Sequence, residues 1–510
     1  MDISFDQFID TYASWCPLML YKRDGMITQY PDTPRSPVIA SPDEFHPNRE
    51  GFVSYGIEYD EQIDFFVQRE SLRKQVPMAT LFSYGSRENS DYANCIINAK
   101  NSYLSMVVVE SEDVCYSISI KDGCINVFNS VMVRDNCQNV YQSIGIIKSY
   151  NIFYSKYCHN CSDIRFCTNC IGCAHCLFCN DMENASYCIQ NIEYSPEEYQ
   201  QKKQALLKKN KHKFYQTYTS LSAKSKNIVS DNVSGQLLIE CSDVQNGYYS
   251  YKVQNSHNTF LVWGKEWNQH IANMFVWGAP SSDHMYGSVL GGMYSEHVYA
   301  STMFDNCNNM WYSIMMADCS YCFGCVWLKN KQFCILNKQY KKDERFTIVD
   351  KILHDLDEQW DIWSFFPAKM NPFYLNDTMA AVIKNYEANY CTDHGYMWRE
   401  DSIKADIPAG AEVVKVSELS NYEWRTNTSS WPSSEAKGKD LSDNKDSSSQ
   451  SSSEWQKWHI DPSILKKIIV DDQGNYYRVV QMEYDFLVKN KLPLPRKHRM
   501  DRMKENFRLQ

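Results

Sequence analysis

The sequence predicts a mainly β protein, built as two duplicated parallel β-solenoid (β-helix) blocks with helical caps and small α+β terminal modules. The template C-x2-C-x2-C-x8-C occurs at 173–188 and again at 319–334, so each of its cysteines recurs 146 residues later. Short β-prone runs also recur every 12–13 residues through both stretches, separated by Asn, Asp, Ser and Gly. A fixed short period of strands and turns is typical of a solenoid, whose turns are stable only when stacked.

The period is clearest in pairs of residues that each follow a small polar cluster. The large aromatic members of these pairs favour a wide solenoid in which one such period forms half a turn. A narrow coil, in which one period forms a full turn, remains an alternative. The pairs are Val114-Cys115, Val127-Phe128, Val140-Tyr141 and Ile152-Phe153.

Both blocks end in the same way. Residues 186–209 match 332–356, with Asn191 over Asn337 and Tyr194 over Tyr340. The segment 195–198 reads Ser-Pro-Glu-Glu, a capping box with proline at the first helical position, so a helix should begin there. A helix over the last coil would protect the solenoid edge from pairing with other chains.

Composition excludes several classes of protein. Hydrophobic residues make up 43% of the 510 residues, as in folded globular chains, and the net charge is −10. The first residues carry acids where a signal peptide has basic residues, and no apolar run reaches the about 18 residues of a membrane span. We therefore expect a cytoplasmic protein without a membrane segment.

The stretch 306–340, with "NCNNMWYS" followed by "CFGCVWLKNKQFCILNKQY", resembles a family of uncharacterised bacterial proteins with tandem Cys-rich repeats. The similarity extends to 55–68, 88–105, 395–401 and 490–503. It supports the duplicated architecture, and it implies no activity.

Members of that family resemble zinc ribbons at both ends, with C-x2-C pairs near 470–473 and 498–501. This chain has Val-Asp-Asp-Gln and His-Arg-Met-Asp at these places, and no cysteine between Lys22 and His46. A structural zinc site needs four soft or imidazole ligands. The resemblance therefore implies terminal modules that have lost their metal.

Seven regions follow from these patterns. They are an N-terminal degenerate zinc-ribbon-like or α+β region (1–90), solenoid block 1 (91–194), a basic helical cap and linker (195–228), solenoid block 2 (229–340), a helical cap with a Trp-rich region (341–425), a disordered Ser-rich linker (426–454) and a C-terminal basic module (455–510).

Two cysteine quartets are the strongest candidate site. The C-x2-C spacing aims two thiolates at one point, so each quartet could hold structural zinc, and an iron–sulfur cluster or redox chemistry is a further alternative. We favour core ladders without a metal, because one small buried residue type recurs at equivalent positions of a solenoid. The quartets are Cys173, Cys176, Cys179 and Cys188, and Cys319, Cys322, Cys325 and Cys334; Cys115, Cys124, Cys137, Cys158, Cys161, Cys167 and Cys170 fit the same ladders.

Two basic segments interrupt the acidic background and could neutralise phosphates of a nucleic acid. Solvated helix faces and a soluble tail would explain them equally simply. The candidate residues are Lys202, Lys203, Lys208, Lys209, Lys211, Lys213, Arg496, Lys497, Arg499 and Arg502.

Other polar and aromatic patterns are weaker. At half-turn spacing, His257 and His284 would share one face, and His270 and His297 another, where imidazoles could bind a metal or titrate. Four acids near the starts of turns could form a catalytic cluster, although Asp is first a turn residue. Aromatic side chains of block 2 could stack on a ligand or fill the core. The acids are Asp283, Glu296, Asp305 and Asp318; the aromatics are Trp263, Trp267, Trp277, Tyr286, Tyr294, Tyr299, Trp311 and Trp327.

The chain has no Walker-type loop, G-x-S-x-G or H-E-x-x-H motif, so we assign no catalytic residue. We expect a non-enzymatic binding or scaffold protein that presents its solenoid surface to a macromolecular partner, a protein or ribonucleoprotein, with RNA as the first to test. The alternatives are a polysaccharide-acting β-helix enzyme and a metal-binding or redox protein that uses the quartets. The expected cofactor is none, or structural zinc.

Overall fold

The structure is a computed structural model that describes residues 3–41, 49–209, 235–259, 262–268, 274–275, 283–292, 294–359, 364–400, 410–426 and 457–507, with the single residues 227, 230, 233 and 407. The chain forms two compact units. One is Met1–Glu400 with Met503–Gln510, and the other is Asp401–Arg502.

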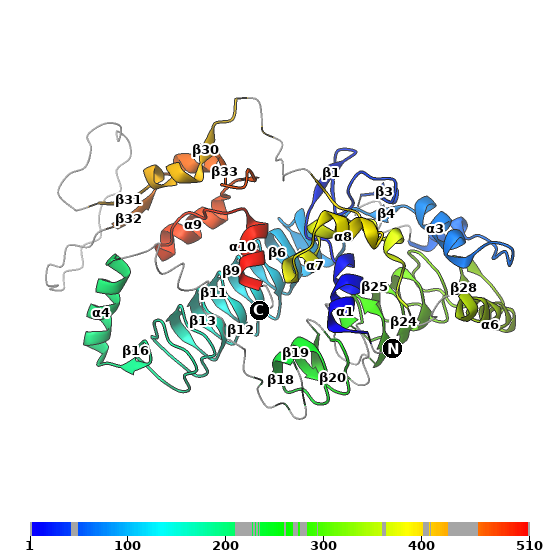
Figure 1. Ribbon diagram of the computed structural model, residues 1–510, viewed down its shortest axis with the longest axis horizontal. Coiled ribbons are helices and arrows are strands. Elements are labelled where there is room, and N and C mark those ends of the chain that lie inside the picture. Colours follow the sequence, from blue (N-terminus) through cyan, green and yellow to red (C-terminus); the bar gives the residue numbers. More distant parts are fainter. Residues whose placement is uncertain are drawn as a thin grey trace. The chain divides into compact units, whose positions relative to one another are not determined.

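Block 1 is a parallel β-solenoid, seen in Figure 1 as a row of stacked strands that ends at β16. The long strand β6 (Tyr92–Val109) pairs with β5 (Ser83–Glu88) and starts two ladders. One ladder contains β7 (Glu112–Cys115), β9 (Ile125–Phe128), β11 (Gln138–Tyr141), β13 (Tyr150–Phe153) and β15 (Ser162–Arg165); the other contains β8 (Ile118–Ile120), β10 (Val131–Arg134), β12 (Ile144–Ile147) and β14 (Lys156–His159). The predicted solenoid is confirmed.

The expectation that one period forms half a turn is wrong. Gln138 pairs in register with Tyr150, one period later in the chain, and with Ile125, one period earlier, so a single period closes one complete coil. The expectation failed because it placed the large rings inside. Val127 belongs to the buried core cluster and Phe128 does not, so only the first member of that pair lines the interior.

Each coil has four walls, which hold three residues each in the coils from Lys156 onward. From Lys156 to Arg165 the bridges to the next coil fall at every third residue. Residues with positive φ recur at the same interval, for example Tyr157 (56°), Asn160 (52°) and Asp163 (54°). Asn and Asp tolerate this left-handed conformation better than most residues, which explains why they punctuate the repeat.

The interior consists of four columns of small side chains, one on each wall. One column is apolar and contains Val114, Val127, Val140, Ile152 and Ile164, and then Cys176 and Cys188. A second column contains Ser105, Ser117, Ser130, Ser143 and Ser155, and then Cys167 and Cys179.

Block 2 repeats this arrangement. Its strands are β18 (Gly235–Ile239), β19 (Gly247–Val253), β20 (Trp263–Asn268), β21 (Met274–Phe275), β22 (Asp283–Tyr286), β23 (Ser288–Val289), β24 (Glu296–Tyr299), β25 (Thr302–Asp305), β26 (Asn308–Trp311) and β27 (Ile314–Ala317). The serine column recurs in part, since Ser313 N donates to Ser301 Oγ (3.1 Å) and Cys325 N to Ser313 Oγ (3.1 Å).

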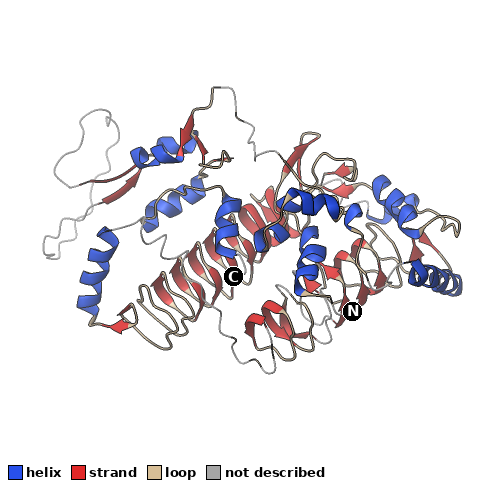
Figure 2. Ribbon diagram, in the orientation of Figure 1, coloured by secondary structure: helices blue, strands red, loops and turns tan. Residues whose placement is uncertain are grey.

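Each block closes with a short antiparallel hairpin and a helix (Figure 2). The predicted capping box is present, because Glu198 N donates to Ser195 Oγ (3.3 Å) and Ser195 N to Glu198 Oε2 (3.2 Å). The hairpins and helices are β16 (Cys188–Ile189), β17 (Ile192–Glu193) and α4 (Pro196–Lys209) in block 1, and β28 (Cys334–Ile335), β29 (Lys338–Gln339) and α6 (Lys342–Gln359) in block 2.

The N-terminal residues pack against block 2 and against residues 364–400. In this region the Asp10 carboxylate accepts hydrogen bonds from the hydroxyls of Tyr386 and Tyr390 and from Lys384 Nζ (3.2 Å). The elements are α1 (Phe5–Tyr12), η1 (Ala13–Trp15), β1 (Tyr21–Arg23), β2 (Met26–Thr28), β3 (Ile39–Ala40), η2 (Arg49–Tyr55), α3 (Phe65–Gln75), β4 (Met78–Ala79), η3 (Ala368–Met370), η4 (Leu375–Asp377), α7 (Met379–Ile383) and α8 (Ala388–Asp393).

The second unit is a small α+β module. Its parallel pair β30–β33 continues into the antiparallel pair β33–β34, and β31 pairs with β32. The elements are β30 (Val413–Lys415), η5 (Val416–Tyr422), β31 (Glu423–Thr426), β32 (Lys457–Ile460), η6 (Pro462–Lys466), β33 (Ile468–Val470), β34 (Tyr476–Tyr477), α9 (Gln481–Asn490) and α10 (Arg499–Phe507), the last of which extends beyond the unit. Within the described residues, no helix is both long and apolar enough to span a bilayer.

Candidate functional site in the cysteine-lined coils

The cysteine quartets lie inside the last coils of their blocks. Cys173, Cys176 and Cys179 occupy three different walls of one coil, and Cys188 stacks in the column of Cys176. Cys319, Cys322, Cys325 and Cys334 repeat this arrangement. All eight side chains are buried, and all 20 cysteines of the chain are free thiols.

Thiols replace hydroxyls in the serine column without a change of role. Ser143 Oγ donates to Tyr141 O (2.9 Å) and accepts from Ser155 N (3.1 Å). Cys167 Sγ likewise donates to Arg165 O (3.3 Å) and accepts from Cys179 N (3.4 Å). Each side chain thus satisfies backbone groups of two successive coils, which a valine could not do.

Burial favours the protonated form of several of these thiols, whereas hydrogen bonds from neighbouring thiols lower the pKa of Cys179 to about 3 and that of Cys319 to about 4. It raises the pKa of Cys158 and Cys167 well above the ordinary value, that of Cys95 to about 12 and that of Cys241 to about 11. Nucleophilic attack and metal ligation both require the thiolate. Among the described side chains, no three His, Cys, Asp or Glu residues converge to hold a metal ion. Cys115 is also buried, but in the column of Phe128 outside the core cluster.

We predict that the purified protein carries no stoichiometric zinc, because its inward thiols are each committed to neighbouring carbonyls. Native mass spectrometry under reducing, chelator-free conditions should give the mass of the apo chain. About two zinc ions per chain, released together with loss of β structure, would contradict this and make the quartets metal clasps.

Reciprocal substitutions should separate the two columns. Cys167→Ser should change the free energy of unfolding by less than about 1 kcal/mol, whereas Cys167→Val should cost about 1–3 kcal/mol because it leaves Cys179 N without an acceptor. In the apolar column the order should reverse, with Cys176→Val tolerated and Cys176→Ser costing about 1–2 kcal/mol. Denaturant unfolding of the four variants measures this, and equal costs in both columns would contradict it.

Among the candidate basic side chains that the structure describes, only Lys202 is exposed. Lys202 is exposed and lies 4.8 Å from the Tyr194 ring centroid, and Lys203 is half-buried over Tyr199 (5.2 Å). The structure does not describe the side chains of Lys208 and Lys209, nor residues Lys211 and Lys213.

The C-terminal candidates are engaged within their own module. Arg499 and Arg502 are buried, and Arg502 Nη1 lies 3.3 Å from the buried Glu483 Oε1. Arg496 Nη1 donates to Val416 O (3.3 Å), and Lys497 is half-buried.

Histidines and aromatics form outer columns of block 2. His284 and His297 stack directly (4.8 Å between centroids, 4° between planes), so the expectation of separate faces is wrong, since one period makes a full coil. Tyr286, Tyr299 and Trp311 stack in another column at 5.5 and 4.1 Å.

The remaining members of these sets do not gather in one place, and several lie outside the described residues. His270 and Trp277 are not described, nor are the side chains of Trp263, Trp267 and Asp283. Trp327 is buried and Tyr294 exposed. Of the four acids, Asp318 accepts from Asn306 Nδ2 (2.8 Å) in a corner ladder, and Glu296 lies in the column of Asp283 rather than in that of Asp305.

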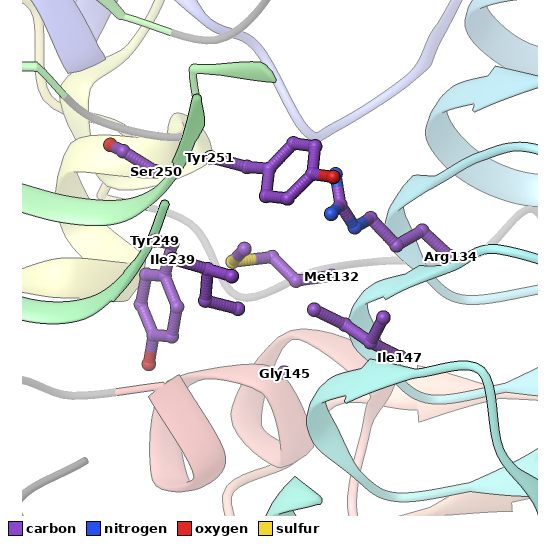
Figure 3. A pocket seen from close by; sticks show the side chains of 8 residues that line it. All are labelled: Met132, Arg134, Gly145, Ile147, Ile239, Tyr249, Ser250 and Tyr251. Carbon is purple, nitrogen blue, oxygen red and sulfur yellow. The ribbon is translucent and has the colours of Figure 1, made fainter. Parts of the chain in front are cut away.

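A buried histidine of block 1 was missed by the sequence analysis. His159 lies in one wall column with Arg134 and Ile147, and Nε2 of its ring has no hydrogen-bond partner in the structure as described. Arg134 stacks on Tyr251 (3.5 Å to the centroid), beside a shallow apolar pocket between the blocks that Met132, Ile147, Ile239 and Tyr249 help to line (Figure 3). Burial, and then Arg134, lower the pKa of His159 to about 4.

His159 should make the protein less stable in acid. Because its pKa is about 4 in the folded state against 6.5 ordinarily, the unfolded chain binds the extra proton between these values. Stability should therefore fall as pH drops from 6.5 to 4, by at most about 1.4 kcal/mol per pH unit. His159→Ile, which matches its column neighbours Ile147 and Ile171, should remove this part of the dependence. Parallel stability–pH curves for the two proteins would contradict it.

A clamp on the end of block 2 was also not expected from the sequence. Residues 52–59 run along the last hairpin, where Ile57 N donates to Leu336 O (3.1 Å) and Tyr59 N to the Tyr340 hydroxyl (3.3 Å). The fully buried Asn337 side chain bonds Val326 N (2.8 Å), Val326 O (2.7 Å) and Phe52 O (3.2 Å). The matched spacing of Asn191 and Asn337 was the available signal, but nothing local indicated the partner segment.

A carboxylate stands where the resemblance places zinc ligands. Asp471 Oδ1 accepts from the backbone N–H groups of Gln473 (3.0 Å) and Asn475 (2.9 Å), and Oδ2 accepts from His498 N (3.0 Å). Asn475 Nδ2 donates to Asp501 Oδ2 (3.1 Å). Hydrogen bonds thus join the two segments in which the C-x2-C pairs were expected.

No protein-family model matches the chain, and no curated protein is significantly similar to it in sequence.

Proposed function

We propose that the chain is a non-enzymatic binding or scaffold protein that offers the outer faces of its solenoid blocks to a macromolecular partner, with RNA or a ribonucleoprotein as the first to test. One observation carries this proposal. The thiols and hydroxyls inside the blocks bond successive coils, as Ser143 and Cys167 do. A filled interior leaves the repeating exterior as the surface for recognition.

The RNA part of the proposal rests on helix α4 and the basic run after it. The C-terminal arginines contribute less, because Arg499 and Arg502 are buried. On α4, Glu197 and Glu198 lie in the first turn and the lysines follow toward the C-terminus. Lysines that neutralise phosphates make binding fall steeply with salt. The free state of all 20 thiols suits a reducing compartment, so we retain the cytoplasm as the proposed location.

Fluorescence anisotropy with a labelled structured RNA tests this proposal between 50 and 200 mM salt, a range over which phosphate contacts weaken binding by about 10³ or more when many are made. Neutralising five lysines of α4 and its run should abolish binding at low salt, whereas neutralising five exposed lysines elsewhere should not. The first set is Lys202, Lys208, Lys209, Lys211 and Lys213; the control set is Lys74, Lys100, Lys341, Lys342 and Lys415. No binding at low salt, or equal loss in both variants, would overturn the RNA proposal.

A further inference from the structure

The two blocks end in the same hairpin, but the residues that the structure describes cover only the hairpin of block 2. At the end of block 2, Leu336 and Asn337 are fully buried beneath residues 52–59. Their counterparts in block 1, Gln190 and Asn191, are exposed, and Ile192 at the next position is 56% exposed. Among the described residues, the internal duplication therefore provides a filled and an empty copy of one surface.

The filled copy defines how an occupant binds. The 3-10 helix η2 ends at Tyr55, and the residues after it give a backbone hydrogen bond from Ile57 to Leu336 in the hairpin turn. Gly56 passes so close that a Cβ there would lie 2.7 Å from the backbone of Asn337 and Lys338. Pairing through the backbone at a hairpin edge is a recurrent mode of peptide capture.

The empty copy keeps the acceptors for this pairing. Asn191 retains its own clasp on the last coil, with Asn180 N donating to Oδ1 (2.9 Å) and Nδ2 donating to Asn180 O (2.8 Å). No N–H group of the described residues donates to the Gln190 carbonyl, which corresponds to Leu336 O. None of the residues that the structure describes covers this turn.

Charge is reversed between the two ends. Block 2 presents Lys329, Lys331 and Lys338, and Lys338 Nζ lies 2.8 Å from Glu58 Oε1 of the covering segment. Block 1 presents exposed Asp181, Glu183 and Glu193 around its hairpin. An acidic occupant suits the first end, and a basic one suits the second. Two copies of the block 1 end would repel each other, so charge disfavours a second copy of this chain as the occupant.

We propose that the turn of the β16–β17 hairpin at the end of block 1 docks a basic peptide of a partner protein, with a glycine where it crosses Asn191. The peptide would donate a backbone hydrogen bond to Gln190 O, pack an apolar group on Ile192 and place Lys or Arg beside Glu193. This inference rests on the proposed binding function and identifies one partner class. It is independent of RNA binding by α4.

The probe is the synthetic peptide FVSYGIKYK, which is segment 52–60 with both acids replaced by lysine. Isothermal titration against the full chain should give one site. A peptide with N-methyl isoleucine in place of the residue aligned with Ile57 should bind about fivefold to tenfold more weakly, because it lacks the donor for Gln190 O. Replacing the peptide's glycine by alanine should abolish binding.

Matched variants locate the site. Ile192→Lys with Glu193→Gln introduces the side chains that block 2 has at these positions and should lose the peptide, whereas Lys338→Ile with Gln339→Glu at the covered end should leave binding unchanged. No binding by the wild-type chain, or equal loss in both variants, would overturn the proposal. So would binding that appears only when Lys208, Lys209, Lys211 and Lys213 are neutralised, since the chain's own basic run would then be the occupant. The five-lysine α4 variant should keep peptide binding while losing RNA, which separates the two proposals.

Discussion

Asn337→Ala should destabilise the end of block 2 by about 3–5 kcal/mol. The side chain is fully buried and makes three hydrogen bonds, to both backbone groups of Val326 and to Phe52 O. Alanine would leave these groups buried without partners and would loosen the covering segment. Hydrogen exchange at Val326 and Ile57 should accelerate together, and denaturant unfolding should show the loss of stability.

Asn191→Ala is the matched control, because Asn191 clasps the last coil of block 1 in the same way but is exposed. Water can replace its two bonds to Asn180, so the cost should stay near about 1 kcal/mol or below. Equal costs at the two positions would mean that the covering segment 52–59 contributes nothing to the end of block 2.

Asp471→Ala should cost the C-terminal module about 3–5 kcal/mol, since one carboxylate accepts three backbone N–H bonds. Its removal would separate the β33–β34 turn from the segment at His498. Circular dichroism and limited proteolysis should show the module unfolding, while the solenoid keeps its β signal because the two form separate units.

Asp472→Ala serves as the control for this prediction, because Asp472 is the adjacent acid and is exposed. It should change stability by less than about 0.5 kcal/mol. Equal losses of stability in the two variants would contradict the role of the Asp471 hydrogen bonds.

The period, the duplication and the helix start at Ser195 could be predicted because they depend on local spacing. Coil width could not, because ring size alone does not tell whether Phe128 faces inward or outward. Its neighbour Val127 enters the core, and only the register of the strands reveals this. The burial of His159 was invisible for a similar reason, since it depends on a wall column whose successive members lie a whole coil apart in the chain.

The candidate sites divide in the same way. The repeat was enough to predict that the quartet cysteines are buried. That cysteine takes the role of serine could be seen only when the structure showed which residues stack in one column. The clamp on Asn337 brings in Phe52 from the other end of the unit's sequence, and no local pattern reports such a contact. The basic tail shows the opposite error: Arg502 looked solvent-facing in sequence, but it pairs with Glu483 inside the module.

The four-walled coil also makes the length of block 1 adjustable in fixed steps. Coils of two lengths coexist, since the step from Ser130 to Ser143 is longer by one position than the step from Ser143 to Ser155, so one wall absorbs an insertion without disturbing its neighbours. Deletion of one complete coil, for example residues 143–154, would bring Ser155 into the place of Ser143. Each interior column would then continue without a break. Each such step would shorten the block by about 4.8 Å, the spacing of paired strands. Engineered chains could therefore differ in the length of block 1 by whole coils while keeping both ends intact.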